Sequence, residues 1–236
     1  MKTELHILHE DNHLLVVNKP AVLATMGAKP QEPSLLNDCK AYLKKKHAKP
    51  GNVYLGVVSR LDSWVTGAIV FARTSKAASR LNQQFRERTV DKSYLAIVAG
   101  KPPASSGQLE DWVIKNDQQR RMEVTQPNTQ GAKIAKLEYQ LIDQIETGQR
   151  TNRKPEVISL ISIKLFTGRK HQIRVQLAHL GLPIVGDRKY GSKERFANGI
   201  ALHAQSLAFN HPTLKNRLSF ESVSYTHLTL PTNREV

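Results

Sequence analysis

The stretch Gly56-Val57-Val58-Ser59-Arg60-Leu61-Asp62 leads an apolar strand directly into an arginine and an aspartate that flank a leucine. Successive side chains of an extended chain alternate between faces, so Arg60 and Asp62 are expected to point the same way and Leu61 toward the core. A carboxylate then lies beside a cation at the end of a strand. Two interpretations follow. The pair is either a routine surface ion pair, or a catalytic carboxylate whose ionised form is favoured by the positive charge beside it.

The residues on either side of this stretch predict an α+β fold. Two short strands joined by the turn Asp11-Asn12 are expected between His6 and Pro20, and further runs of strand length at 53–59, 67–72, 92–100, 135–142 and 157–166. Ser34 and Thr74 or Ser75 are expected to begin two helices, and a short third helix should run from about 170 to 180. The polar segment 102–133 is typical of an exposed loop or a hairpin. Many strands with only three clear helices indicate a central mixed, mostly antiparallel sheet in two halves with flanking helices.

The charge balance points to a polyanion as partner. The chain of 236 residues has a net charge of +15 and a pI near 10.0. Its lysines and arginines are spread over several clusters, such as Lys44-Lys45-Lys46 and Arg120-Arg121, whereas a disordered basic tail would gather them at one end. Nucleic acid is the first candidate partner, and a generally basic surface is the alternative.

Composition also predicts a compartment. Cys39 has no second cysteine to pair with and is expected to be a small buried side chain, which suits a reducing environment. No segment reaches the run of about 18 apolar residues that spans a bilayer, and the first residues lack the apolar stretch of a signal peptide. We therefore expect a cytoplasmic protein with no membrane partner.

Several familiar sites are absent from the sequence. It has no glycine-rich phosphate loop, no dinucleotide fingerprint and no cysteine and histidine set with zinc spacing. His171 and His179 are too far apart to grip a metal as neighbours on one helix face. Nothing in the sequence requires a cofactor or a metal, so we expect neither.

Four motifs resemble the RluA-type family of RNA pseudouridine synthases, and they follow the order of that family between about Leu5 and Ser222. The motifs are Glu10 to Ala21 (EDNHLLVVNKPA), Val58 to Asp62 with Thr66-Gly67 (VSRLD, TG), Lys92 to Ala96 (KSYLA), and Gly168 to Gly191, which includes GRKHQIRV and ends in YG. The resemblance implies the pseudouridine synthase fold, with an active-site cleft between the two halves of the sheet. It also implies isomerisation of specific uridines in structured ribosomal or transfer RNA without a cofactor.

The resemblance assigns three catalytic residues. Asp62 matches the indispensable aspartate, which acts on the sugar either as a nucleophile or as a base. Arg174 matches the arginine that pairs with this aspartate, and a fixed cation is needed because a buried carboxylate otherwise takes up a proton. Tyr94 matches the tyrosine that stacks on the target base and accepts the ring proton. Taken alone, Arg174 reads as a surface helix arginine and Tyr94 as a core aromatic.

The resemblance also predicts contacts with RNA. A uracil stacked in folded RNA has to be extruded before it can react. Arg60 is then expected to fill the vacated space, unless it only pairs with Asp62. Arg169 and His171, in the motif around Arg174, are the other expected RNA-binding residues.

The sequence departs from the family pattern at a few positions. Ser59, Val22 and Gln176 replace the residues that are usual there, and Ser63-Trp64-Val65-Thr66 replaces the usual loop after the aspartate. Val22 stands where glycine is common. Trp64 suits two roles, stacking on a base or packing against the protein.

We expect one catalytic domain over 1–222, followed by an atypical tail over 223–236 that reads as non-native sequence. RNA recognition should come from the catalytic domain, because the pattern begins within the first ten residues, and we expect a monomer without an obligate protein partner. Two other functions compete with uridine isomerisation. One is a non-catalytic RNA-binding or RNA-chaperone protein that keeps the fold. The other is a metal-dependent nuclease, which would need clustered carboxylates around Asp62.

Overall fold

The computed structural model describes residues 5–27, 29, 32–48, 50–147 and 156–222. This described part contains eleven strands, three α-helices and one 3-10 helix, which confirms the α+β prediction. It forms two compact units, the first built from the described residues up to Lys92 together with those from Ala204 on, and the second from the described residues of Ser93–His203. No helix of the described residues is long and apolar enough to cross a membrane. The predicted tail over 223–236 lies outside the described residues.

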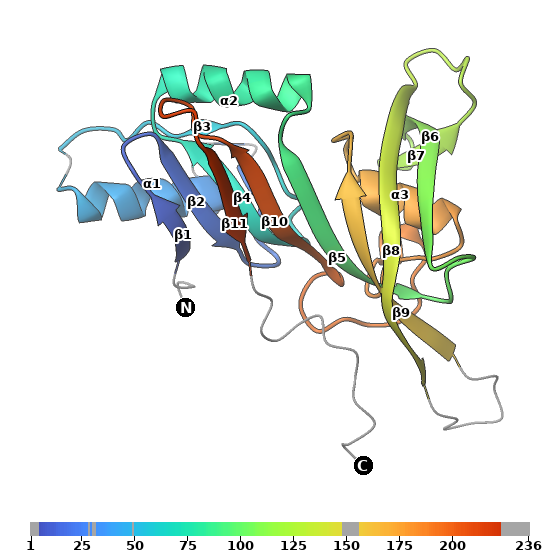
Figure 1. Ribbon diagram of the computed structural model, residues 1–236. Coiled ribbons are helices and arrows are strands. Elements are labelled where there is room, and N and C mark those ends of the chain that lie inside the picture. The colour runs from blue at the N-terminus through green and yellow to red at the C-terminus, as the bar shows by residue number, and fades with distance from the viewer. Residues whose placement is uncertain (1–4, 28, 30–31, 49, 148–155, 223–236) are drawn as a thin grey trace. The chain divides into compact units, whose positions relative to one another are not determined.

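The first unit is a sheet with a helix on each face (Figure 1). Its strands run in the order β1 (His6–Glu10), β2 (Leu14–Lys19), β4 (Thr66–Ala72) and β10 (Leu202–Asn210), with β3 (Gly56–Val57) paired to β4 and β11 (Arg217–Glu221) to β10. The pairs β1–β2 and β2–β4 are antiparallel. Its helices are α1 (Leu35–Lys46) and α2 (Ser75–Glu87).

Strand β2 shows why both faces are covered. Leu14 and Val16 belong to the same core cluster as Leu81 of α2. Leu15 and Val17, which point the other way, belong to a second cluster with Cys39 of α1. An uninterrupted apolar run is what a strand buried on both faces requires.

Both predicted helix starts of the first unit are confirmed. The Ser34 hydroxyl accepts the amide of Asn37 at 3.4 Å, and the Thr74 hydroxyl accepts the amide of Ala77 at 3.1 Å. These bonds satisfy amides that have no partner within the first helical turn.

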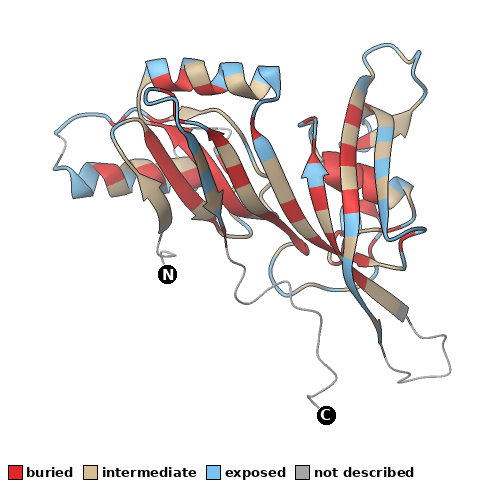
Figure 2. Ribbon diagram, in the orientation of Figure 1, coloured by how far each residue is buried: buried red, intermediate tan, exposed pale blue. Residues whose placement is uncertain are grey.

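The second unit is an antiparallel sheet with a buried helix. Its strands run in the order β5 (Asp91–Ala99), β9 (Glu156–Leu165), β8 (Lys133–Thr147), β6 (Ser106–Asn116) and β7 (Arg121–Thr125). Strands β6 and β7 form the hairpin that was one of the two interpretations of segment 102–133. Helix α3 (Gln172–His179) is buried over most of its length (Figure 2) and is followed by the 3-10 helix Arg188–Tyr190.

The strand predicted at 53–59 is wrong in its length. Only Gly56 and Val57 pair with β4, opposite Ala72 and Phe71. Beyond them the backbone leaves the sheet, and Leu61 bonds to the side chain of Thr25 instead of to a strand. The alternation argued for Arg60 and Asp62 therefore does not apply, although Leu61 still packs against a core cluster as predicted.

Gly67 has a position that only glycine fits. Its φ is +118°, and a Cβ added there would lie 2.2 Å from the carbonyl oxygen of Ala204. The backbones of residues 67 and 204 thus approach each other directly, which any side chain at 67 would prevent.

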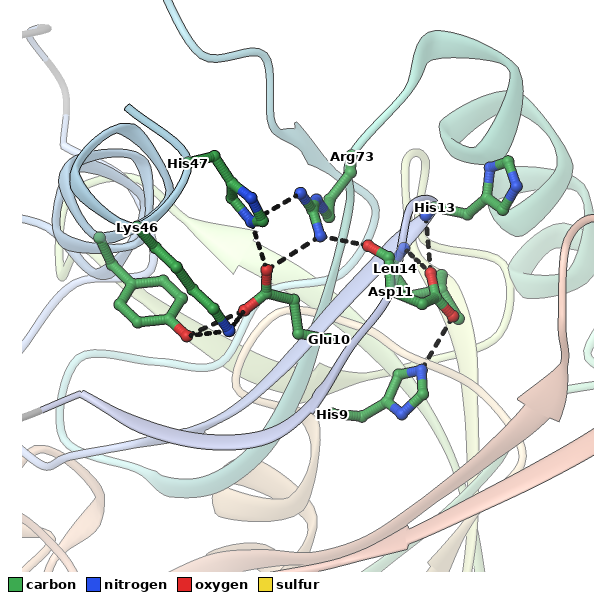
Figure 3. A network of polar contacts seen from close by, with 9 residues as sticks. His9, Glu10, Asp11, His13, Leu14, Lys46, His47 and Arg73 are labelled. Atoms are coloured by element: carbon green, nitrogen blue, oxygen red, sulfur yellow. Dashed lines mark hydrogen bonds and ion pairs between the residues drawn. The ribbon is translucent and has the colours of Figure 1, made fainter. Parts of the chain in front are cut away.

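A polar cluster around Glu10 ties the β1–β2 hairpin to α1 and to the residue after β4 (Figure 3). The Glu10 carboxylate accepts from Tyr42 and Lys46 at 2.9 Å each, contacts His47 at 2.7 Å and accepts from Arg73 at 3.1 Å. Burial raises the pKa of Glu10, but the hydrogen bonds from Lys46, His47 and Tyr42 outweigh it and lower this pKa to about 2. Glu10 is therefore ionised in the folded protein far below its usual range.

We expect this cluster to set part of the acid stability. Because the folded pKa of Glu10 is depressed from 4.5 to about 2, its contribution is complete above pH 4.5 and is lost as the pH falls toward 2. Glu10→Gln should cost about 2 kcal/mol at neutral pH and should flatten the loss of stability between pH 4.5 and 2. Urea unfolding at a series of pH values measures both effects. If the free energy of unfolding of the variant fell with pH as steeply as that of the original protein, the role given to Glu10 would be contradicted.

Candidate active site

Asp62 lies in a turn that the protein fixes on both sides. The Leu61 amide donates to the hydroxyl of Thr25 at 3.1 Å, and this hydroxyl donates to the Leu61 carbonyl at 2.8 Å. On the other side, the Val65 amide donates to the Asp62 carbonyl at 3.1 Å, and the Val65 side chain is buried. The backbone of the aspartate is thus held in place, while its side chain is only half-buried.

Lys19 is the main residue of this region that the sequence analysis missed. Its side chain is completely buried, and its ammonium donates to the carbonyls of Pro20 at 2.8 Å, Leu23 at 2.7 Å and Ser63 at 3.1 Å. Three acceptors match the three N–H donors of a lysine ammonium. One nitrogen therefore joins the segment after β2 to the turn that holds Asp62.

The alternation of side chains along β2 could have predicted that Lys19 is buried. On β2 it shares a face with Leu15 and Val17, both of which are core residues. A lysine in that register is expected to be buried, and a buried lysine needs acceptors.

Lys19 and Asp62 interact electrostatically. Burial lowers the pKa of Lys19 to about 7, and the negative charge of Asp62 acts in the opposite direction and raises it. The three carbonyl acceptors also favour the charged ammonium. The structure thus places a cation that the sequence analysis gave no role within electrostatic reach of Asp62, whereas the Arg60 side chain is exposed.

Val22, in the segment that Lys19 holds, has a strained backbone. Its φ is +59°, and its side chain is 61% exposed. A β-branched residue rarely adopts this left-handed conformation, which explains why glycine is common at this place in the motif.

Val22→Gly is therefore expected to raise the free energy of unfolding by about 0.5–1 kcal/mol. The substitution removes the backbone strain of the folded state, and the greater freedom of glycine in the unfolded chain offsets part of this gain. Chemical denaturation measures the change. Val22→Ala is the control, because it removes the same exposed methyl groups and keeps a Cβ at positive φ. A larger increase in the free energy of unfolding for Val22→Ala than for Val22→Gly would contradict the assignment of backbone strain to residue 22.

In the second unit, Arg174 lies in the buried helix α3 and is only 4% exposed, so the surface-arginine interpretation is wrong. Its Nε donates to Asp187 Oδ2 at 2.6 Å, and its Nη2 donates to Asp187 Oδ1 at 2.8 Å. The guanidinium also lies 5.0 Å from the centroid of the Tyr190 ring. This bidentate pair was not foreseen from the sequence, and both carboxylate oxygens of Asp187 take part in it.

The other predicted residues of the second unit also have defined places. Tyr94 is buried on β5 opposite Ile163 of β9. Arg169 donates from Nε to the Ile134 carbonyl at 2.9 Å. His171, with a φ of 52°, contacts the Tyr190 hydroxyl through Nδ1 at 2.8 Å.

The predicted site residues fall on both units. Asp62 and Arg60 belong to the first unit together with Lys19, and Tyr94, Arg169, His171 and Arg174 belong to the second. A shared cleft lined by Arg60, Asp62, Tyr94 and Arg174 stays a prediction of the sequence. What the structure establishes is an aspartate on a fixed turn with a buried lysine in electrostatic reach, and separately a buried arginine paired with Asp187.

Comparisons with known proteins agree on one family. The model of the RNA pseudouridylate synthase family matches residues 13–179. An uncharacterised RNA pseudouridine synthase of Bacillus subtilis is 35% identical over 89% of this chain and 65% of its own length. The dual-specificity RNA pseudouridine synthase RluA of Escherichia coli is 32% identical over 92% of each chain. This chain thus spans somewhat less than two thirds of the Bacillus protein.

Solved structures show the same fold. The human RNA pseudouridylate synthase domain containing protein 4 superposes with a TM-score of 0.72 at 25% identity, over 92% of this chain and 88% of the human one. The human RNA pseudouridylate synthase domain containing protein 1 superposes with a TM-score of 0.71 at 25% identity, over 93% of this chain and 83% of the human one.

Proposed function

The chain belongs to the RNA pseudouridylate synthase family, RluA type, and from this we propose that it converts specific uridines of structured ribosomal or transfer RNA into pseudouridine. The observation that carries the proposal is the family match, which includes Asp62 in its fixed turn. Two further relatives, from Buchnera aphidicola and Pseudomonas aeruginosa, are named as pseudouridine synthases of the large ribosomal subunit, which supports ribosomal RNA as one substrate class.

The reaction needs no oxidant and no reductant. The bond between ribose C1′ and uracil N1 breaks, the base turns, and a bond forms between C1′ and C5 of the ring. The proton on C5 leaves, and N1 gains a proton, so that atoms and charge balance. The reaction therefore requires only acid–base catalysis and electrostatic stabilisation, both of which side chains can provide.

We assign the catalytic roles as follows. The ionised Asp62 acts on the ribose, and the nearby Lys19 ammonium supports its charge. Arg174 is the second cation, a guanidinium that the bidentate pair with Asp187 holds in one orientation in the buried helix. Tyr94 contacts the target base and takes up the C5 proton.

RNA binding is assigned to the basic surface. A net charge of +15 supports phosphate contacts that do not depend on sequence and that weaken steeply with salt. Arg60, exposed beside the catalytic turn, fills the space that the extruded uridine leaves. Arg169 and His171 add contacts from the second unit. We further propose that residues 1–222 act as one catalytic domain, as a cytoplasmic monomer without a cofactor.

The function is tested with RNA from a strain that lacks the gene. Total ribosomal and transfer RNA is incubated with the protein, labelled with a pseudouridine-specific reagent and read by primer extension, because isomerisation leaves the mass unchanged. A new stop at a defined uridine is expected and names the substrate. RNA binding without any new stop would overturn the proposal and favour the alternative of a non-catalytic RNA-binding protein.

A further inference from the structure

The turn that follows Asp62 displays a single aromatic side chain. Lys19 holds the Ser63 carbonyl, and Val65 is buried, so the residues on both sides of Trp64 are fixed. Trp64 itself is 49% exposed. A large ring on a fixed backbone can bind a flat partner with little loss of conformational freedom.

Two more exposed apolar residues lie on the segment joined to this turn. Val22 is 61% exposed and Met26 is 43% exposed. Val22 precedes Leu23, whose carbonyl shares the Lys19 ammonium with Ser63, and Met26 follows Thr25, which bonds to Leu61. Three of the seven large apolar side chains exposed in the described part of the chain thus belong to two segments that are bonded to each other beside Asp62.

Single exposed apolar residues need no explanation, but a group beside a catalytic residue points to a ligand. A strongly basic chain draws RNA to its surface, and extrusion of the target uridine leaves the neighbouring bases without a stacking partner. Every base has a flat face that an aromatic ring can cover, whatever its sequence.

We propose that Trp64 stacks on an unpaired RNA base next to the target uridine, with Val22 and Met26 in contact with the same nucleotide. This inference rests on the proposed function, since it places the base next to the reacting nucleotide. Trp64 is then a binding residue that selects substrates with an unpaired flanking base.

Fluorescence tests the stacking directly. The chain contains two tryptophans, so Trp112→Phe leaves Trp64 as the only one. Titration of this variant with an RNA hairpin that carries uridines in its loop should quench the emission, and a fully paired duplex of the same length should quench it much less. Trp64→Phe, which keeps only Trp112 of β6, is the matched control and should show little quenching.

Kinetics give the second readout. Trp64→Ala is expected to raise the KM for the RNA substrate by about 5- to 150-fold, the range that corresponds to the loss of one base–aromatic stack. Trp64→Phe keeps an aromatic ring, so its KM should stay close to that of the original protein. Tyr54→Ala, which removes an aromatic of similar exposure elsewhere in the first unit, should leave KM unchanged.

The outcomes separate this inference from the proposed function. Pseudouridine formation with no quenching and an unchanged KM in Trp64→Ala would overturn the inference alone. Quenching by the hairpin without any pseudouridine would overturn the proposed function and leave the stacking in place.

Discussion

Asp187→Asn is expected to lower the free energy of unfolding by about 3–5 kcal/mol, the cost of removing one partner of a buried ion pair. Arg174 and Asp187 are 4% and 1% exposed, and both carboxylate oxygens are bonded to the guanidinium. Asparagine keeps the size of the side chain but removes its charge. The Arg174 guanidinium then loses its bidentate partner in a site where water cannot replace it. Urea unfolding measures the loss.

A double variant separates charge from packing. Arg174→Met combined with Asp187→Leu removes both charges, and apolar pairs in such places are often about as stable as the ion pair. Most of the lost stability should return, while pseudouridine formation should be lost because the double variant removes the cation proposed to act at Arg174. A stability of Asp187→Asn within about 0.5 kcal/mol of the original protein would contradict the structural role of the pair.

Asp62→Asn is expected to lower the rate of pseudouridine formation by at least about 10³-fold. The substitution keeps the size of the side chain and the backbone bonds of the turn, so RNA affinity should change little. It also removes the negative charge that raises the pKa of Lys19, so burial should lower that pKa further. Single-turnover rates with a defined RNA hairpin measure the effect on the chemical step.

Asp38→Asn is the matched control for this experiment. Asp38 is exposed in the first turn of α1, and the same change of charge there should leave the rate unaltered. A similar fall in rate for both variants would mean that the loss at 62 reflects net charge rather than the site.

Much of the fold was predictable from local patterns. The apolar run Leu14–Val17 requires cover on both faces, and α1 and α2 supply it. Ser34 and Thr74 marked the helix starts, because their hydroxyls satisfy amides that a helix leaves without partners. Such signals need only residues close in sequence.

Residues of the candidate site could be predicted only where a motif pointed to them. Asp62 was identified in this way, but its support by Lys19 depends on carbonyls from two separate segments, one of them 44 residues away. Asp187 was missed because its partner Arg174 lies on a different element, 13 residues earlier. The end of β3 at Val57 was also missed, since a hydroxyl of Thr25 takes the place of a neighbouring strand. These features arise from tertiary contacts, which periodicity does not encode.

The most direct test of uridine isomerisation through Asp62 uses RNA that carries tritium on C5 of its uridines. Formation of the bond between C1′ and C5 displaces the C5 hydrogen, so each pseudouridine releases one tritium to water. With RNA from a strain that lacks the gene, the original protein should release tritium in proportion to the modified sites, and Asp62→Asn should release none. No release by the original protein, or equal release by the Asp62→Asn variant, would contradict the assignment.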